Sequence, residues 1–366
     1  MTIRICGDEE MNYVKLKDVC TINMGQSPSS DSYNENGHGV PFFQGNADFG
    51  ERYPITRKWC SAPTKMAAPE DILISVRAPI GAMNYAKEEC CIGRGLAALT
   101  PNREKVAPEY IFWLLKGKNE ELNCKGTGST FKAIGRNILE ETLVPNISLE
   151  KQTECAIILE KTYRVILSRK QQLQKLDELV KARFVEMFGD PELNPRGLPV
   201  LPWNAVFLTT TGKLDSNAMV ENGRYPFFTC AKESYKIDSY AFDSEALLLA
   251  GNNAAGIYDV KHYKGKFNAY QRTYVLRLMN EKWSYILFKR QLEDKLQYLQ
   301  SQSKGTNTRY LTLGLLNELR FVVPPVAEQE QFAAFVEQVD KSKVAVQKAL
   351  DEAQLLFDSL MQKYFG

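Results

Sequence analysis

The chain contains two copies of one sequence pattern, and this repeat constrains its fold more than any other feature. One copy reads KGTGSTFKAIGRNILEETLVP from Lys125, and the other reads KGTNTRYLTLGLLNELRFVVP from Lys304. The loops are 179 residues apart (304 − 125 = 179), whereas the segments from Gln152 and Gln329 onward are offset by 177 residues (329 − 152 = 177). Each copy is as long as a whole domain. The sequence therefore predicts two similar domains, each followed by a similar long helix.

Local patterns assign boundaries to these parts. Residues 1–10 are polar and are interpreted as a leader, which would place the functional start at Met11. The predicted parts that follow are a first globular domain at 11–147, a first helix at 148–189, a second globular domain at 190–326 and a second helix at 327–366.

Both globular domains have the pattern of a mixed α/β fold. In the first domain the apolar runs at 71–76 and 95–101 predict strands, and residues 107–115 predict a helix. The second domain repeats this order at 246–251, 273–278 and 283–292. The segment between Gln26 and Gly50 is rich in Gly, Ser, Asn and Pro and predicts a long surface loop.

Two long amphipathic helices are the most regular elements that the sequence predicts. Ser148 can cap the first helix, and each helix carries a narrow apolar seam that is typical of an antiparallel coiled-coil pair. Such a pair would give the molecule a pseudo-twofold arrangement. The seam residues are Leu159, Tyr163, Ile166, Leu173, Leu176, Val180, Phe184, Met187, Val336, Val339, Val346, Leu350, Ala353, Phe357, Leu360 and Tyr364.

The length of the helices suits a spacer. At a rise of 1.5 Å per residue, about 40 residues span roughly 60 Å, against about 34–36 Å between consecutive half-sites on one face of DNA. Such helices could hold two DNA-reading domains apart. A helical hairpin that only stabilises the fold or mediates dimerisation has the same periodicity and stays an alternative.

The composition excludes several classes of protein. No apolar run is long enough to cross a membrane, and the chain does not start like a signal peptide, so we expect a cytoplasmic protein. The net charge of +2 gives no global basic field, so any nucleic-acid surface must be local. With 2 histidines and no CxxC pair among 8 cysteines, a metal site is not expected.

Motifs of catalysis are absent from the sequence. The segment GTGSTFK has the wrong spacing for a phosphate-binding loop, and no Asn-Pro-Pro-aromatic tetrapeptide of the kind found in amino-methyltransferases occurs. No histidine or paired-acid arrangement indicates a nucleophile or a hydrolase. The chain is therefore predicted to be a binding and organising protein. It is expected to have no catalytic residues, no metal and no cofactor of its own.

The two KGT loops are the first candidates for contact with a ligand. A lysine, several hydroxyls and glycines that let the backbone approach closely suit phosphate oxygens. An ordinary glycine-rich turn is the alternative, and recurrence at corresponding places in both copies favours function. The candidates are Lys125, Thr127, Ser129 and Thr130 in the first loop and Lys304, Thr306, Asn307, Thr308 and Arg309 in the second.

Other polar residues could read base edges. Arginine pairs with guanine through two hydrogen bonds, and asparagine or glutamine pairs with adenine in the same way. Each such residue taken singly is more often a solvated polar side chain, and the nearby aromatic residues are expected in the core. The candidates are Gln44, Asn46, Arg77, Asn84 and Arg94 in the first domain and Lys232, Asn252, Asn253, Gln271 and Arg272 in the second.

Longer phrases of the sequence resemble the specificity subunit of type I restriction-modification systems. In the first half these are INMGQSPSSDSYNENGHGVPFFQGNADFG, DILISVRAPIG, KGTGSTFKAI and RFVEMFGD. In the second half they are TTGKLDSNAMVENGRYPFFTCAKE, ALLLAGNNAAGIY, FNAYQRTYVLRL and KGTNTRYLTLG. The resemblance covers essentially the whole chain and includes the order domain, helix, domain, helix.

This resemblance implies that each globular part is a target-recognition domain that reads one half of a bipartite site in double-stranded DNA. It implies that the helices set the gap between the half-sites and bind two methyltransferase subunits of a DNA adenine methyltransferase. Those partners would carry S-adenosylmethionine, and restriction subunits would carry ATP and Mg²⁺. Two alternatives are a coiled-coil scaffold with two ligand-binding domains and a stand-alone methyltransferase or endonuclease with divergent motifs.

Overall fold

The computed structural model describes residues 12–128, 132–305 and 307–366. The predicted leader, Met11 and three KGT-loop candidates (Ser129, Thr130 and Thr306) lie outside these ranges. None of the helices in the described ranges is long and apolar enough to span a membrane.

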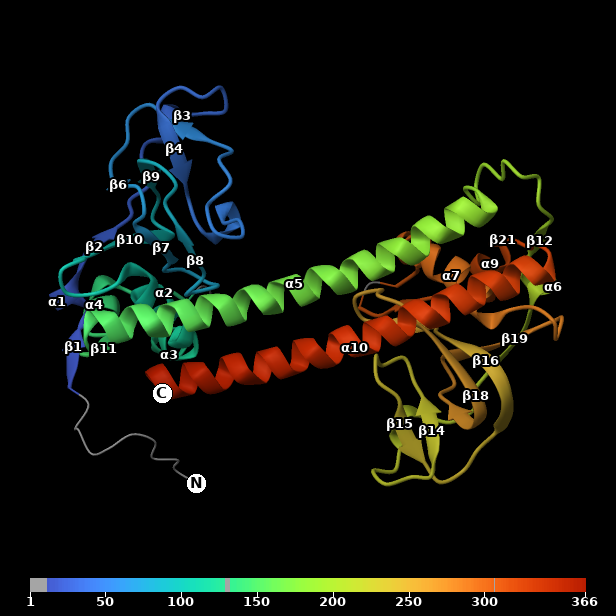
Figure 1. Ribbon diagram of the computed structural model, residues 1–366. Helices are drawn as coiled ribbons and strands as arrows, with labels where there is room; N and C mark the ends of the chain where they lie inside the picture. Colours follow the sequence, from blue (N-terminus) through green and yellow to red (C-terminus); the bar gives the residue numbers. More distant parts are fainter. Residues whose placement is uncertain (1–11, 129–131, 306) are drawn as a thin grey trace. The chain divides into compact units, whose positions relative to one another are not determined.

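The chain divides into two compact units. The first comprises Met1–Arg169 with Ala349–Gly366, and the second comprises Lys170–Lys348. Each unit holds one mixed α/β domain and part of each of two long helices, α5 (Leu149–Phe188) and α10 (Val326–Phe365) (Figure 1). The mixed α/β fold and the repeated domains predicted from the sequence are therefore present.

The first unit contains two sheets and a two-stranded ribbon. One sheet has the order β2 (Cys20–Met24), β10 (Leu96–Pro101), β7 (Ile72–Ser75), β8 (Met83–Tyr85). The other has the order β3 (Tyr33–Asn34), β5 (Trp59–Cys60), β4 (Val40–Phe43), β9 (Cys90–Ile92), β6 (Met66–Ala67). The ribbon pairs β1 (Tyr13–Lys15) with β11 (Leu143–Pro145). The short helices are α1 (Leu16–Val19), α2 (Pro108–Gly117), α3 (Asn119–Lys125), α4 (Arg136–Glu140) and the 3-10 turns η1 (Ser30–Ser32) and η2 (Asn46–Asp48).

The central strands of the first unit are buried on both faces. Successive residues of a strand point to opposite faces, so Ile72 and Ile74 of β7 pack toward α2, whereas Leu73 packs toward the second sheet. This explains why the strand reads as a continuous apolar run. The prediction of one long loop between Gln26 and Gly50 is wrong, because β3 and β4 lie within it and β4 is largely buried.

The second unit repeats this arrangement. Its main sheet has the order β13 (Phe207–Thr211), β19 (Thr273–Leu278), β16 (Phe242–Ala250), β18 (Val260–Ala269), β14 (Tyr225–Phe228), β15 (Tyr235–Ile237). Two ribbons pair β12 (Val200–Pro202) with β21 (Arg320–Val322) and β17 (Asn252–Asn253) with β20 (Arg309–Tyr310). The short helices are α6 (Trp203–Val206), α7 (Tyr285–Asp294), α8 (Leu296–Gln302), α9 (Leu313–Asn317) and the 3-10 turn η3 (Ser216–Ala218).

A buried glutamine fastens each long helix to its own domain. The Oε1 of Gln152, in α5, accepts a hydrogen bond from the backbone N–H of Ala107 at 2.9 Å, just before α2. The Oε1 of Gln329, in α10, accepts one from the backbone N–H of Ser284 at 3.0 Å, just before α7. Their side chains are 1% and 0% exposed. Because the same bond recurs at the repeat offset, the junction of helix and domain is part of the repeat.

In the first unit the long helices pack on α2 through an aromatic cluster. The ring of Trp113 in α2 lies 5.3 Å from that of Tyr163 in α5 and 5.6 Å from that of Phe357 in α10. The Nζ of Lys116 lies 3.7 Å from the centroid of the Tyr163 ring. Every predicted seam residue of α5 and α10 is buried or half-buried. We name the contact of α2 with α5 and α10 the first joint.

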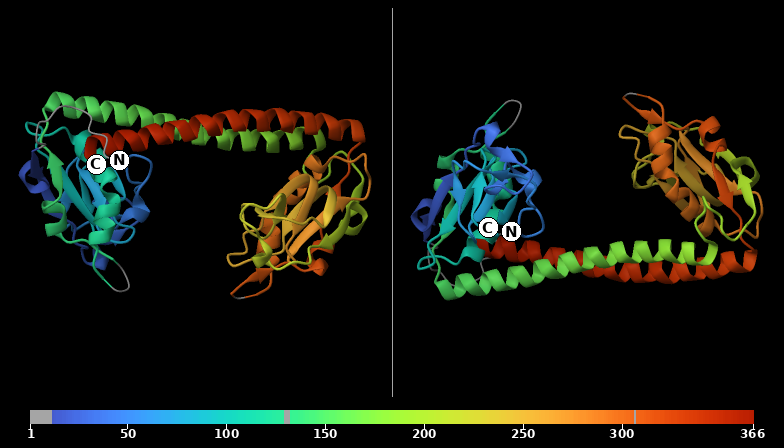
Figure 2. Two further views of the ribbon diagram at one scale, coloured as in Figure 1. Left: turned by 90° about the horizontal axis from the view of Figure 1, so that it is seen from below. Right: turned by 90° about the horizontal axis from the view of Figure 1, so that it is seen from above.

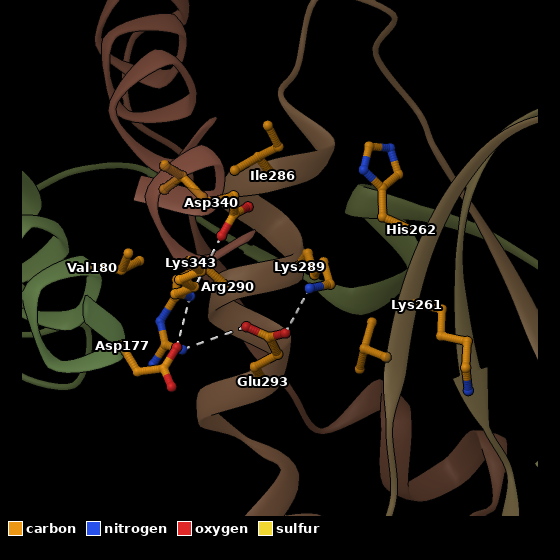
Figure 3. A pocket seen from close by; sticks show the side chains of 12 residues that line it. Asp177, Val180, Lys261, His262, Ile286, Lys289, Arg290, Glu293, Asp340 and Lys343 are labelled. Carbon is orange, nitrogen blue, oxygen red and sulfur yellow. Dashed lines mark hydrogen bonds and ion pairs between the residues drawn. The ribbon is translucent and has the colours of Figure 1, made fainter. Parts of the chain in front are cut away.

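The second unit builds the equivalent contact, the second joint, partly from ion pairs (Figure 3). The Nζ of Lys343 in α10 lies 2.7 Å from a carboxylate oxygen of Asp177 in α5 and 3.4 Å from one of Asp340. In α7, Glu293 pairs with both Lys289 and Arg290. These residues line a cavity of about 510 Å³ between α7, β18 and the two long helices.

The two joints occupy the same positions of the repeat. Arg290 stands at the position of Trp113 (290 − 113 = 177), and Asp340 stands at the position of Tyr163 (340 − 163 = 177). Flexible charged side chains fill less of the space than interlocking rings do, which accounts for the cavity in the second unit. The first joint is therefore closely packed and aromatic, whereas the second is polar along this face.

Candidate nucleic-acid interface

In each domain, two neighbouring parallel strands have their carboxyl ends side by side at one end of a sheet. In the first unit Phe43 of β4 pairs with Ile92 of β9, and in the second unit Phe228 of β14 pairs with Ala269 of β18. Because the carboxyl ends of parallel strands meet at one edge, the residues after them lie together. The predicted candidates Gln44 and Arg94 follow the first pair, and Gln271 and Arg272 follow β18.

The first KGT loop continues this edge. Backbone bridges join Ala133 to Thr127 and to Arg77, which follows β7. The neighbouring N–H of Val76 donates to the carbonyl of Gly95 at 2.9 Å. One edge of the first domain thus carries, in order, Thr127 of the KGT loop, Arg77, Arg94 and Gln44. We name Gln44, Arg77, Arg94, Lys125 and Thr127 the first strip; all of them are exposed.

The second domain has the same arrangement. Asn252 and Asn253 form β17, which pairs with β20 of the second KGT loop, and Lys304 bridges Tyr310 at the base of that loop. The N–H of Gly251 donates to the carbonyl of Arg272 at 2.9 Å, as Val76 does to Gly95 in the first domain. We name Asn252, Asn253, Gln271, Arg272, Lys304 and Arg309 the second strip. Among the remaining candidates, Asn307 and Thr308 are exposed in the same KGT loop.

Three other candidates lie beside or away from the strips. Asn46 is half-buried in the turn η2 that follows Gln44, and Lys232 is exposed in the segment after β14. Asn84 is 1% exposed, and its amide bonds to both the N–H and the carbonyl of Gly50. Asn84 is therefore occupied within the domain, and its prediction as a base-reading residue is corrected.

Some residues of the strips already have partners within the protein. The ammonium of Lys125 lies 2.5 Å from a carboxylate oxygen of Glu121, and hydrogen bonds from Lys125 and Lys118 lower the pKa of Glu121. Asn253 accepts from the N–H of Ala255 at 2.8 Å and so shapes its own turn. Lys304 is also exposed, at the base of its loop, but it forms no ion pair with any residue in the described ranges. The two KGT lysines therefore differ in how free they are to meet a phosphate.

A glycine lets the neighbouring loop pack closely against each strip. A Cβ atom on Gly25, after β2, would lie 2.2 Å from the carbonyl oxygen of Gly93. One on Gly212, after β13, would lie 1.8 Å from the carbonyl oxygen of Ala269. Only glycine allows this approach. The loops that begin at these glycines bring Ser27 and Asp215 to the strips, and neither residue was predicted from the sequence.

The two strips suit contact with an extended polyanion such as a nucleic acid. The strips present arginine, lysine and amide side chains, which can contact phosphates and hydrogen-bond base edges. No group of three or more histidine, cysteine or acidic residues within the described ranges could hold a metal ion. The two domains therefore present similar polar edges, and the first and second strips are the candidate binding surfaces.

Comparison with known proteins identifies the family. The family model described as "Type I restriction modification DNA specificity domain" matches residues 8–178 and 206–353, which is most of the chain. The chain belongs to this family. This is the family that the phrases in both halves of the sequence were found to resemble.

Individual relatives carry the same description. The chain is 41% identical over 160 residues to the putative type I restriction enzyme MjaX specificity subunit of Methanocaldococcus jannaschii, covering 44% of this chain but 38% of that protein. It is 36% identical over 160 residues to the EcoDI specificity subunit of Escherichia coli, of which it covers 35%. The match thus spans little more than a third of these two relatives. The MjaIX specificity subunit of M. jannaschii is 25% identical and aligns over 95% of this chain and 91% of its own length.

A solved structure has the same fold. The type I restriction-modification S subunit from M. genitalium matches with a TM-score of 0.67, covering 100% of this chain and 99% of that one. At 15% sequence identity, this likeness concerns the fold alone.

Proposed function

We propose that this chain is the DNA-recognition subunit of a type I restriction-modification complex and that each strip reads one half of a bipartite site. The observation that carries the proposal is the repeated edge, in which a KGT loop and a strand-end turn bring amides and cations together in both domains. Phosphate contacts would position the duplex, and the amides and guanidinium groups would select bases.

The long helices suit the role of a spacer that sets the gap between half-sites. Support comes from the buried glutamine that fixes each helix to its domain and from the seam residues, which are all buried or half-buried. We further propose that the helices form an antiparallel coiled coil in a pseudo-twofold arrangement. Surfaces beyond the seam would dock two methyltransferase subunits.

Chemistry would reside in the partners. We propose that methyltransferase subunits bring S-adenosylmethionine and that restriction subunits bring ATP and Mg²⁺, in the cytoplasm. The absence of methyltransferase and phosphate-loop motifs from the sequence supports a chain that is not an enzyme by itself. The purified chain alone should transfer no labelled methyl group to DNA.

Replacing Lys304 by alanine is expected to weaken DNA binding equally for all sequences. A phosphate contact adds affinity without reading bases, so the slope of log K against log salt should become about 0.9 shallower. Lys125→Ala should have a smaller effect, because Glu121 already pairs with Lys125. The measurement is DNA affinity of the complex with its methyltransferase partner at several salt concentrations.

Lys282→Ala is the matched control for this measurement. Lys282 is exposed in the turn before α7 and lies outside the second strip, so its loss should leave the slope unchanged. An unchanged slope for Lys304→Ala would remove the KGT loops from the interface.

A further inference from the structure

Each domain presents one exposed glutamine whose amide is held by the glycine-started loop beside it. In the first unit the Nε2 of Gln44 donates to the Oγ of Ser27 at 2.8 Å. In the second unit the Nε2 of Gln271 donates to the Oδ2 of Asp215 at 3.4 Å. Ser27 follows Gly25, and Asp215 follows Gly212, so the same loop of the repeat supplies both acceptors.

The acceptors are themselves fixed. The Oγ of Ser27 also accepts from the backbone N–H of Arg94, at 3.3 Å. The other carboxylate oxygen of Asp215 accepts from the N–H of Asn217 at the start of η3, at 3.4 Å. A carboxylate can only accept hydrogen bonds, so the amide nitrogen of Gln271 must face it and the carbonyl oxygen must point elsewhere. The amide of Gln271 thus has a set orientation before any ligand arrives, and in the structure the amide nitrogen of Gln44 likewise faces its acceptor.

The two glutamines do not occupy equivalent positions of the repeat. Gln44 follows β4, whereas Gln271 follows β18, at the place that Arg94 takes after β9 in the first domain. The two domains therefore reach the same pairing of a glutamine amide with an acceptor in the glycine-started loop from different strands.

An anchored amide distinguishes adenine from guanine. In the major groove adenine offers one acceptor and one donor, N7 and the N6 amino group, whereas guanine offers two acceptors, N7 and O6. A free glutamine amide could turn both of its N–H groups toward guanine. With one N–H held by Ser27 or Asp215, the side chain retains one donor and one acceptor, which match adenine.

We infer that Gln44 and Gln271 each read an adenine in the major groove, one per half-site, and that Ser27 and Asp215 are positioning residues for them. This inference rests on the proposed function, because it takes the strips as the DNA-reading surface. It adds the base class and the residues that enforce it.

The test selects bound sequences from randomised duplex DNA with the complete complex and compares variants. Gln44→Ala and Gln271→Ala should each lose an adenine preference of about 5- to 150-fold at one position, in different half-sites. Ser27→Ala and Asp215→Ala should keep the affinity for the adenine-containing site within a few-fold while accepting guanine there. Asp215→Asn retains a side-chain oxygen acceptor and should retain the adenine preference.

Gln297→Ala is the matched control, because Gln297 is exposed on α8 and lies outside the second strip. The inference is overturned if Ser27→Ala and Asp215→Ala keep the wild-type preference for adenine over guanine. It is also overturned if the glutamine variants change no adenine position. A wild-type complex that selects no bipartite sequence would instead contradict the proposed function itself, so the two failures are distinguishable.

Discussion

Trp113→Ala is expected to lower the free energy of unfolding of the first unit by about 3–5 kcal/mol, the usual effect of removing a large buried aromatic side chain. Trp113 is 1% exposed, and its ring contacts both long helices through Tyr163 and Phe357. Its removal would leave a cavity that these rings cannot fill without moving. Amide hydrogen exchange in α2 and in the first part of α5 measures the loss locally.

Arg290→Ala, at the equivalent position of the second unit, is the matched comparison. Its side chain lines a polar cavity, and its partners Glu293 and Asp294 are 32% and 44% exposed. Partly exposed ion pairs contribute little, so the loss should stay near about 1 kcal/mol. Equal losses at Trp113 and Arg290 would contradict the contrast between an aromatic first joint and a polar second joint.

Gly212→Ala is expected to abolish reading of the second half-site while leaving the first intact. The added Cβ would lie 1.8 Å from the carbonyl oxygen of Ala269, so the turn that carries Gln271 and Arg272 must shift. Losing two base contacts would reduce affinity for the complete site on the order of 100-fold or more. Overpacking should also destabilise the second domain by about 1–3 kcal/mol.

Gly314→Ala controls for the general effect of adding a methyl group in this domain. The nearest atom to a Cβ on Gly314 lies 3.8 Å away, at the hydroxyl of Thr312, so the substitution should fit. The measurement is affinity for DNA that carries both half-sites or only one. If Gly212→Ala bound the second half-site normally, the close packing at Gly212 would not be needed to hold Gln271 and Arg272 in place.

The repeat made most of the fold predictable from the sequence. Apolar runs marked the central strands β7 and β10 because both faces of those strands are buried, so periodicity and burial agree there. Ser148 was predicted to cap α5, and its Oγ accepts from the N–H of Lys151 at 3.3 Å. Both long helices extend over the predicted apolar seams, because a narrow apolar stripe that keeps helical spacing over many turns is typical of a long amphipathic helix.

Long-range contacts account for what the sequence did not reveal. Strand β4 was missed because glycine, serine and asparagine surround it, and only its pairing with β5 and with distant β9 makes it a strand. Asn84 resembled a free polar residue because its partner Gly50 lies 34 residues away. Ser27 and Asp215 gave no local signal, since each is defined by the glutamine that the fold brings to it.

The central claim is that the two domains read separate halves of one DNA site. The most direct measurement replaces residues 11–147 by the corresponding domain of a relative and selects bound sequences from randomised duplex DNA with the methyltransferase partner present. The account predicts that the wild-type complex selects two short motifs at a fixed gap and that the exchange changes one motif while the other motif and the gap stay the same. A change in both motifs together, or selection of a single continuous motif by the wild-type complex, would contradict it.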